Sequence, residues 1–471
     1  MNINIKLAII VLSAGFLAFV GCKKDDYASG YVVTNVDTVD NPITIAPIVS
    51  IGPSGNSYYV SSLIGADTSD GLSSTTPFKS ISKAVFKATA GDTVFFMNGT
   101  YTANNSTLLN ITKSGSGGRY ITYKAYPGHN PVLYGPGTVW NIVSINASYI
   151  IIDGIEVKGD NANLTYAGAY TAYTYAAGGG KDQSQYAKYN TNGISIGGPN
   201  TSSVFPTHVV VQNCKIHDCS GGGISSIQAD YTTIQGNLVY NNAWYMMYAG
   251  SGISILNPFN SDGVTGYKNI VKDNIVYTNK TQIPWISIKG LSDGNGIIMD
   301  VNQTGYNGKG PAYNGRTLVA NNVSYNNGGS GIHAFKASHV DIINNTAYGN
   351  GTVVGYANIY ASSAIDCKIK NNIMYAANNG KCNLSNNGNN NVVYDYNIYY
   401  NGTVGERGGH DKVADPHFIS LSTDASVANF LLNNGSPAID GGTRSIYYSK
   451  DIRGVARPQG GKVDCGAYEV Q

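Results

Sequence analysis

Short apolar runs recur through the middle of the chain, and each ends at an asparagine. Segments such as YTTIQGNLVYNN, RTLVANNVSYNN and HVDIINNTAYGN share this pattern. β-Branched residues in short runs bounded by turn residues predict strands. The repeated asparagines lie 24, 37, 48, 23, 27 and 25 residues apart, which predicts a unit of about two dozen residues with two long insertions. They are Asn213, Asn237, Asn274, Asn322, Asn345, Asn372 and Asn397.

A second column of Gly-Ile pairs keeps step with the asparagines. Coils stacked at roughly 4.8 Å would superimpose like residues, so that asparagines hydrogen-bond along the stack and aromatic rings stack as well. No sustained 3.6-residue period is present, which argues against a helical solenoid. The Gly-Ile pairs begin at Gly193, Gly223, Gly252, Gly296 and Gly331, and the tyrosines that follow six of the asparagines are Tyr240, Tyr277, Tyr325, Tyr348, Tyr375 and Tyr400.

This pattern resembles the right-handed parallel β-helix of the pectin-lyase-like fold over most of residues 56–410. We therefore expect an all-β, right-handed parallel β-helix solenoid. SISKAVFKATAGD (80–92) places Ile81, Ala84, Val85 and Ala88 on one face of a short helix, which would cap the N-terminal end of the stack. DPHF, SPAIDGG and DIRGVARP…DCGAYE resemble the C-terminal module of bacterial choice-of-anchor β-helix surface proteins, so residues 411–471 are expected to form a C-terminal capping module.

The N-terminus has the features of a bacterial lipoprotein signal. Lys6 precedes a short apolar stretch that ends at Gly21-Cys22, too short for a membrane span. A small residue followed by cysteine resembles a lipobox, which implies a signal peptide at 1–21, lipidation of Cys22 and a tether over 22–55. An ordinary secretory signal is the alternative. The expected location is the outer membrane, with the lipid anchor as the only membrane contact.

Composition narrows the classes of partner. A net charge of +2 with 12% charged residues offers no surface of the nucleic-acid-binding type. Five cysteines remain after Cys22, without CxxC spacing, which argues against a disulfide framework or a zinc site, although one or two bridges stay open. We expect a monomer.

Strand alternation predicts which side chains leave the interior. After each Gly-Ile pair, the first outward column reads Ser195, Ser225, Ser254, Ile298 and His333, and the second reads Gly197, Ile227, Leu256, Asp300 and Phe335. Asp300 and His333 would be diagonal neighbours, about 7–8 Å apart between Cα atoms. Lys336 falls where the strand turns, so its direction stays open. A solvated surface role is the alternative for His333.

Three insertions precede Gly-Ile strands and should gather on one side of the stack. They span 161–192, 241–251 and 279–295, whereas the loop before Gly331 is short. Long walls beside a short floor predict a groove next to Asp300 and His333. Aromatic residues in the walls are candidate sugar platforms, with loop packing as the alternative. They are Trp244, Tyr245, Tyr248 and Trp285.

The groove residues suit acidic polysaccharide chemistry. A lyase neutralises a uronate carboxylate, often with Ca²⁺, and needs a base, which points to His333 or Lys336, with Arg316 as a partner for the uronate. A hydrolase needs two carboxylates, and none of the three glutamates falls in the groove, so aspartates would serve. Candidate calcium ligands are Asp293, Asp300 and Asp262, although Asp293 could equally cap a turn.

No familiar signature of pectate lyases or polygalacturonases is present. The segment DGNGIIMD…GRTLVANN…GGSGIHAF (293–335) resembles a recurring core of bacterial β-helix proteins, without a reaction attached to it. The sequence favours a polysaccharide lyase acting on a uronate-containing polymer. The alternatives are a non-catalytic glycan-binding or structural surface protein and an aspartate-based glycoside hydrolase.

Overall fold

Left-handed turn residues divide the chain into short strands. In the Asn-Asn pairs of the repeat, the first asparagine turns the backbone and the second enters the stack: φ is 55° at Asn321 and Asn344 and 58° at Asn371. Asparagine tolerates this conformation better than most residues. Each coil therefore consists of three strands separated by sharp turns.

The computed structural model describes residues 40–45, 55–198, 205–305, 308, 310–377 and 379–471. The expected signal peptide, Cys22 and most of the tether lie outside these residues. Within them, no helix is long and apolar enough to cross a membrane.

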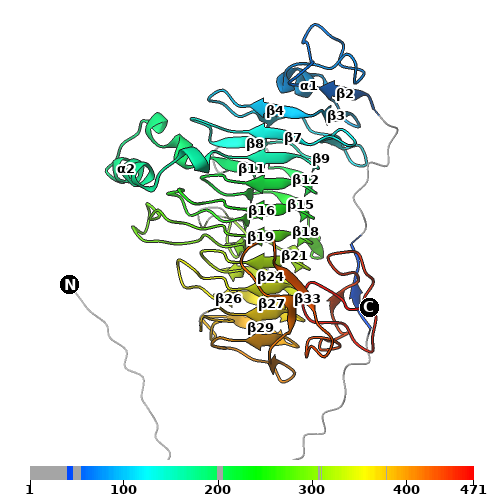
Figure 1. The fold of residues 1–471 in the computed structure, drawn as a ribbon, viewed down its shortest axis with the longest axis vertical. Helices are drawn as coiled ribbons and strands as arrows, with labels where there is room; N and C mark the ends of the chain where they lie inside the picture. The colour runs from blue at the N-terminus through cyan, green and yellow to red at the C-terminus, as the bar shows by residue number, and fades with distance from the viewer. Residues whose placement is uncertain (1–39, 46–54, 199–204, 306–307, 309, 378) are drawn as a thin grey trace, which may run out of the picture. The chain divides into compact units, whose positions relative to one another are not determined.

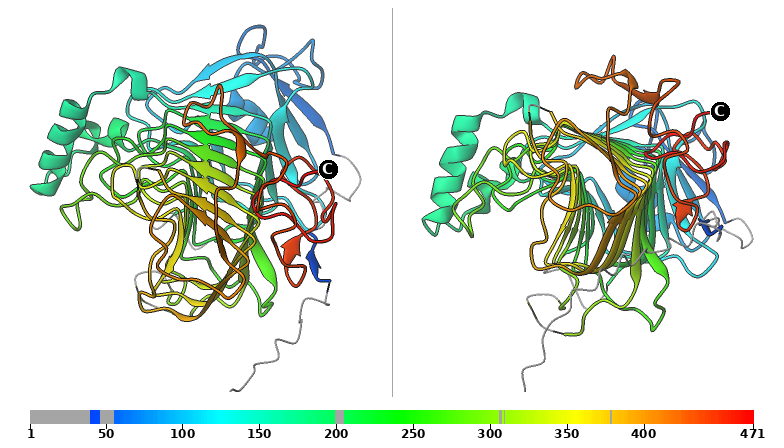
Figure 2. Two further views of the ribbon diagram at one scale, coloured as in Figure 1. Left: turned by 60° about the horizontal axis from the view of Figure 1, so that its bottom comes forward. Right: turned by 90° about the horizontal axis from the view of Figure 1, so that it is seen from below.

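Three parallel sheets run along the stack (Figures 1 and 2). The first has 11 strands: β2 (Ser57–Val60), β3 (Thr93–Phe96), β6 (Ile121–Ala125), β9 (Ile150–Asp153), β12 (Thr207–Gln212), β15 (Asp230–Gln235), β18 (Tyr267–Lys272), β21 (Arg316–Ala320), β24 (Ser338–Ile343), β27 (Ile365–Lys370) and β29 (Asn390–Asp395). The second also has 11: β4 (Gly99–Thr102), β7 (Pro131–Tyr134), β10 (Glu156–Lys158), β13 (Lys215–His217), β16 (Leu238–Tyr240), β19 (Ile275–Tyr277), β22 (Val323–Tyr325), β25 (Thr346–Tyr348), β28 (Ile373–Tyr375), β30 (Ile398–Tyr400) and β31 (Lys412–Val413). The third has eight: β5 (Leu109–Ile111), β8 (Asn141–Ile145), β11 (Asn192–Gly197), β14 (Ile224–Ile227), β17 (Ile253–Leu256), β20 (Ile297–Asp300), β23 (Ile332–Phe335) and β26 (Ile359–Ser362).

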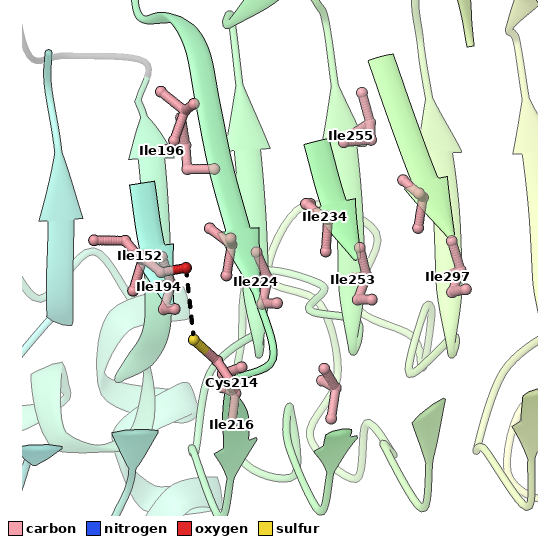
Figure 3. Close-up of a cluster of buried hydrophobic side chains, with 14 of the residues drawn as sticks. Ile152, Ile194, Ile196, Cys214, Ile216, Ile224, Ile234, Ile253, Ile255 and Ile297 are labelled. Carbon is pink, nitrogen blue, oxygen red and sulfur yellow. Dashed lines mark hydrogen bonds between the residues drawn. The ribbon is translucent and has the colours of Figure 1, made fainter. Parts of the chain in front are cut away.

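The interior is filled by columns of like residues. Ile194, Ile224, Ile253 and Ile297 follow one another in register and are fully buried (Figure 3). Every coil thus removes apolar surface from water, and this burial stabilises the fold by about 25 cal/mol per Å² of apolar surface. The expected parallel β-helix is confirmed.

The predicted asparagine ladder is present with one correction. Side-chain amides link Asn237, Asn274, Asn322, Asn345, Asn372 and Asn397 in sequence, with N···O distances of 2.9–3.0 Å. Asn213 is not part of it. Asn213 adopts a left-handed turn, and Cys214 takes the ladder position instead, donating its backbone N–H to Asn237 Oδ1 at 3.0 Å.

A second asparagine ladder, absent from the sequence expectations, explains the Gly-Ile column. It links Asn242, Asn279, Asn327, Asn350 and Asn358. A Cβ on Gly252 would come within 2.7 Å of Asn279 Nδ2, and one on Gly331 within 2.6 Å of Asn350 Nδ2. Glycine is therefore required where the strand passes close to this ladder.

The tyrosine column forms the outer face of the second sheet. The rings of His217, Tyr240, Tyr277 and Tyr325 stack at 4.8–4.9 Å between centroids. Beyond Tyr325, Phe430 contacts both Tyr325 and Tyr348, and the remaining tyrosine pairs meet edge to face.

The C-terminal module packs along the side of the stack at this tyrosine face. Phe418 and Phe430 join a buried cluster with Tyr325 and Ile373. They belong to an antiparallel pair, β32 (Phe418–Ser420) and β33 (Asn429–Leu432), and β34 (Tyr447–Tyr448) pairs with β1 (Pro42–Ile43). Cys214, Cys219, Cys367, Cys382 and Cys465 are all buried free thiols.

The N-terminal cap matches the sequence expectation. Helix α1 (Ile81–Lys87) is capped by the preceding residue Ser80, whose side chain accepts a hydrogen bond from the Lys83 N–H. The helix buries Ile81 and Ala84 in the main core.

The first insertion contains a helix that the sequence pattern did not predict. It comprises η1 (Asn161–Asn163), α2 (Tyr166–Ala177), η2 (Gln183–Gln185) and η3 (Ala187–Tyr189). Ala169 and Tyr173 of α2 share a buried cluster with Met247 of the second insertion and Ile283 of the third. The insertions therefore gather on one side, as expected (Figure 2).

Candidate functional site

The register of the third sheet confirms both predicted outward columns. Ser254 pairs with Ile298, and Ile298 pairs with His333. In the second column Leu256 pairs with Asp300, and Asp300 pairs with Phe335. Asp300 and His333 are therefore diagonal neighbours on β20 and β23.

A groove of about 530 Å³ lies over these strands. Its floor is formed by Ile298, Asp300, His333 and Phe335, and the insertions supply its walls. We name this space the charged groove. Its walls and far edge are lined by Tyr248, Trp285, Ser292, Asp293, Asn295, Lys336 and Tyr356, among others.

Two carboxyl groups line the charged groove in a poorly hydrated setting. Burial raises the pKa of Asp300 to about 7, with a further rise from Asp293 that Lys336 partly opposes. Burial also raises the pKa of Asp293 to about 6, although Ser292 donates a hydrogen bond to its Oδ2 at 2.8 Å. A carboxyl group that titrates near neutral pH can exchange a proton with a bound substrate.

Lys336 lies at the turn after β23, with φ of 45°. Its ammonium is 5.2 Å from the centre of the Phe335 ring, and among the described residues it forms no ion pair. The preceding coil has Val301 at the equivalent position, with φ of 44°. A β-branched residue in this region is strained, and such strain concentrates at functional sites.

His333 differs from the expectation of an exposed base. Its side chain points away from the core, but the residue is only 6% exposed. The imidazole stacks on the Tyr360 ring, with 4.0 Å between the ring centroids, and meets the Tyr356 ring edge to face. Neither ring nitrogen has a hydrogen-bond partner among the described residues. Burial lowers the pKa of His333 to about 3, so the imidazole is neutral at physiological pH and is a weak base.

Two of the four predicted aromatic platforms line the groove. These are Tyr248, which is 36% exposed, and Trp285. Trp244 and Tyr245 instead pack in the insertion cluster, where Trp244 Nε1 donates to Thr278 O at 3.0 Å. Trp244 and Tyr245 therefore pack within the loops, as the alternative predicted, and do not line the groove.

Arg316 lies outside the groove, on β21 of the first sheet. Its guanidinium forms a bidentate pair with Asp341 at 2.6 and 2.8 Å and contacts Asp366 at 2.7 Å. Because its guanidinium is paired with both Asp341 and Asp366, Arg316 has a structural role. It does not face the groove, so the sequence prediction that it pairs with a uronate there is wrong.

Asp262 does not join Asp293 and Asp300. Its carboxylate pairs with Lys268 at 3.0 Å and accepts a hydrogen bond from Tyr231 at 2.8 Å, which lower its pKa to about 2. Across the described ranges, no three His, Cys, Asp or Glu side chains come together to hold a metal ion. Of the three predicted calcium ligands, only Asp293 and Asp300 therefore line the groove together.

Sequence reasoning missed Tyr356 and Asn295. Tyr356 lies in the loop before β26, where Asn358-Ile359 replaces Gly-Ile, so the column search passed over it. Asn295 lines the wall, and its Oδ1 accepts hydrogen bonds from the backbone and hydroxyl of Ser330 at 2.8 and 2.6 Å. Its position directly before a Gly-Ile pair was the available signal.

The crystal structure of pectate lyase Pel9A is similar with a TM-score of 0.54 at 20% identity, covering 90% of this chain and 98% of that one. At this identity the likeness concerns the fold. The GH136 lacto-N-biosidase from Eubacterium ramulus (TM-score 0.42, 16% identity, 73% of this chain and 56% of that one) and an alginate lyase from a Paenibacillus species (TM-score 0.39, 15% identity, 76% and 98%) are too distant to carry an argument.

No curated protein sequence matches the chain. The family model for the Pel9A-like right-handed β-helix region matches residues 58–387, which is more than half of the sequence. That match agrees with the three stacked parallel sheets, and the chain belongs to the Pel9A-like right-handed β-helix family.

Proposed function

We propose that the protein is a polysaccharide lyase that cleaves a uronate-containing polymer by β-elimination in the charged groove. One observation carries the proposal: a lysine without an ion-pair partner among the described residues and a carboxyl group whose pKa is raised to about 7 line the same groove. Family membership and the aromatic walls agree with a sugar polymer as the substrate.

Lys336 is assigned to the uronate carboxylate. A lysine ammonium beside that carboxylate offsets its charge and makes the C5–H more acidic. Because Lys336 is not engaged with Asp300 or Asp293, it can pair with an incoming anion without first breaking an ion pair of its own.

Asp300 is assigned as the base. Its ionised form takes the C5 proton, the C5–H electron pair forms the C4–C5 double bond, and the C4–O bond breaks. The protonated Asp300 then returns that proton to the leaving glycosidic oxygen. A pKa of about 7 suits a group that must both accept and donate a proton near neutral pH.

An aspartate-based glycoside hydrolase is the second candidate, favoured by one observation. Asp293 and Asp300 line the same groove with pKa values raised to about 6 and about 7, so over a narrow pH range one can be ionised while the other is protonated. Hydrolases use such a pair of carboxyl groups.

The deciding experiment incubates residues 23–471 with pectin, alginate, heparinoids and neutral glycans, with and without Ca²⁺. Ultraviolet absorbance of an unsaturated uronate and new reducing ends are followed together. The lyase predicts both signals, and their loss in Asp300→Asn. New reducing ends without ultraviolet absorbance would refute the lyase and favour the hydrolase. Retention of the protein on one glycan, with neither signal, would refute both enzymes and favour a binding protein.

We further propose that the protein acts as a monomer at the outer membrane, anchored through Cys22. Support comes from the lipobox-like Gly21-Cys22 after a short apolar stretch. Cys22→Ala should move the protein from the detergent-soluble membrane fraction to the aqueous fraction. Retention of that variant in the membrane would refute the anchor, and light scattering of residues 23–471 gives the oligomeric state.

A further inference from the structure

We propose that the charged groove continues into a second binding site that holds a neutral sugar, so that the substrate is a polymer in which a neutral sugar adjoins a uronate. The inference builds on the function proposed above and adds the substrate class. The second site is a cavity of about 350 Å³ lined by Phe205, Gln228, Asn257, Pro258, Phe259, Asn260, Gly305 and Pro311. We name it the neutral site.

The two spaces adjoin each other at one edge of the third sheet. Asn257 lines both. Gln228, Asn257, Val301 and Lys336 follow β14, β17, β20 and β23, and all four have left-handed φ angles, of 52°, 45°, 44° and 45°. Adjacent coils are about 4.8 Å apart, so Gln228 and Lys336, three coils apart, mark a path of about 14 Å. A chain of sugars lying along this edge would contact both sites.

The neutral site has no charged side chain among its described lining residues. Its polar groups are amides, and Asn257 Oδ1 is buried without a hydrogen-bond partner among the described residues. A uronate carboxylate placed here would lose hydration without gaining a cation. Sugar hydroxyl groups both donate and accept, so they can satisfy this oxygen.

Two aromatic rings supply a surface for the sugar ring. Phe205 and Phe259 stack at 4.6 Å between centroids, and Phe259 is 37% exposed. An exposed ring beside amide groups is the mixture of apolar surface and a few polar groups that ligand sites present. Phe259 is therefore the central contact of the neutral site.

A buried cluster holds the walls of the neutral site in place. Asp230 pairs with Lys268 at 2.6 Å and accepts hydrogen bonds from Ser261 and Tyr313. Asn260 donates to Ala312 O at 2.8 Å. These contacts join the loop after β17 to the loop before β21. A site fixed before the ligand arrives loses less conformational entropy on binding.

The test measures binding in an Asp300→Asn background by calorimetry. Two probe sets are compared: homo-uronate oligomers (galacturonate and mannuronate) and alternating oligomers of a uronate with a neutral sugar (rhamnogalacturonan and hyaluronan). We expect at least one alternating oligomer to bind about tenfold or more tightly than either homo-uronate. Phe259→Ala and Gln228→Ala should remove that advantage and leave homo-uronate binding within twofold.

Two controls keep the outcome interpretable. Phe259→Tyr retains the ring and should retain the preference, and Phe86→Ala, which removes a 72% exposed ring on α1, should change neither affinity. Equal affinities for both probe sets, unaffected by Phe259→Ala, would overturn the neutral site. Binding is read separately from turnover. A preference for the alternating oligomer that is lost in Phe259→Ala, without turnover of any polymer, would refute the lyase and keep the neutral site. Cleavage of a homo-uronate polymer by the wild-type protein, together with equal affinities for both probe sets, would refute the neutral site and keep the lyase.

Discussion

Lys336 and Asp300 line one groove from neighbouring coils, yet their side chains form no ion pair. The Lys336 ammonium lies over the Phe335 ring, and Phe335 is the residue that pairs with Asp300 across the strands. Lys336 lowers the pKa of Asp300, but less than burial raises it. The cation and the proton acceptor thus line the same groove without pairing, so that Lys336 is available to an incoming carboxylate.

Replacing Lys336 should remove most of the activity without unfolding the protein. Lys336→Met keeps the aliphatic stem against Phe335 and deletes the charge, and we expect kcat/KM to fall about 10²–10⁴-fold, as when a group that acts on the transition state is lost. The rate of absorbance from the unsaturated product measures it. Lys289→Met is the matched control, because Lys289 is an exposed lysine with φ of 54° in the wall loop. Equal losses in both variants would count against the assignment.

The pH profile separates the two enzyme candidates. If Asp300 is the base, its ionised form is active, so kcat/KM should rise about tenfold per pH unit below about 7 and level off above it. If Asp300 were the acid of a hydrolase, kcat/KM would fall above about 7. Initial rates from pH 5 to 9, below KM, decide between them. A decline through pH 7 would remove the base assignment.

Asp300 should also make folding stability depend on pH. Its folded pKa of about 7 lies above the ordinary value of 3.8, so the native state binds more protons than the unfolded state between these values. The stability contribution is fully present below pH 3.8 and is lost as pH rises through about 7. We expect Asp300→Asn to raise the melting temperature by about 2–4 °C at pH 8, and less at pH 5, by calorimetry. An equal effect at both pH values would contradict the raised pKa.

His333 should prove replaceable in the chemical step. His333→Phe keeps the stack on Tyr360 and removes two buried nitrogens without partners, whose desolvation costs about 1–3 kcal/mol. We expect a higher melting temperature and a kcat within about fivefold of wild type. Because His333 is neutral above about pH 4, the pH profile should keep its shape. If the rise or the fall of activity with pH disappeared in His333→Phe, His333 would again be a catalytic candidate.

The register could be predicted because a strand has a period of two, and the Gly-Ile pairs mark where each strand begins. Both outward columns, including Asp300 and His333, followed from that rule. Asn213 was misplaced by one position because the turn residue and the ladder residue are usually both asparagine. Where the ladder residue is Cys214, the pattern gave no sign of the offset.

The environment of each site residue could not be predicted from the same rules. His333 is covered by Tyr360 on the next coil and by Tyr356 from an irregular loop. Whether a wall aromatic faces the groove depends on how the insertions pack. Helix α2 and its neighbours enclose Tyr245 and leave Tyr248 in the groove, although the two lie three residues apart.

The asparagine ladder should dominate stability without affecting the chemistry. Asn322 is fully buried; it accepts hydrogen bonds from the backbone and side chain of Asn274 and donates to Val271 O and Asn345 Oδ1, all at 2.9–3.1 Å. Asn322→Ala leaves these partners unsatisfied in the interior, and we expect a loss of about 2–5 kcal/mol in the free energy of unfolding. Denaturant titration measures it. The matched control is Asn213→Gly, which removes an asparagine outside the ladder and keeps the left-handed turn. The Asn213 side chain donates a hydrogen bond to Asp153 Oδ1 at 2.9 Å. That variant should lose about 1 kcal/mol or less. Each bond of the ladder joins two neighbouring coils, so its loss should weaken their association. If Asn322→Ala loses no more unfolding free energy than Asn213→Gly, the ladder sets the register of the coils without stabilising the stack.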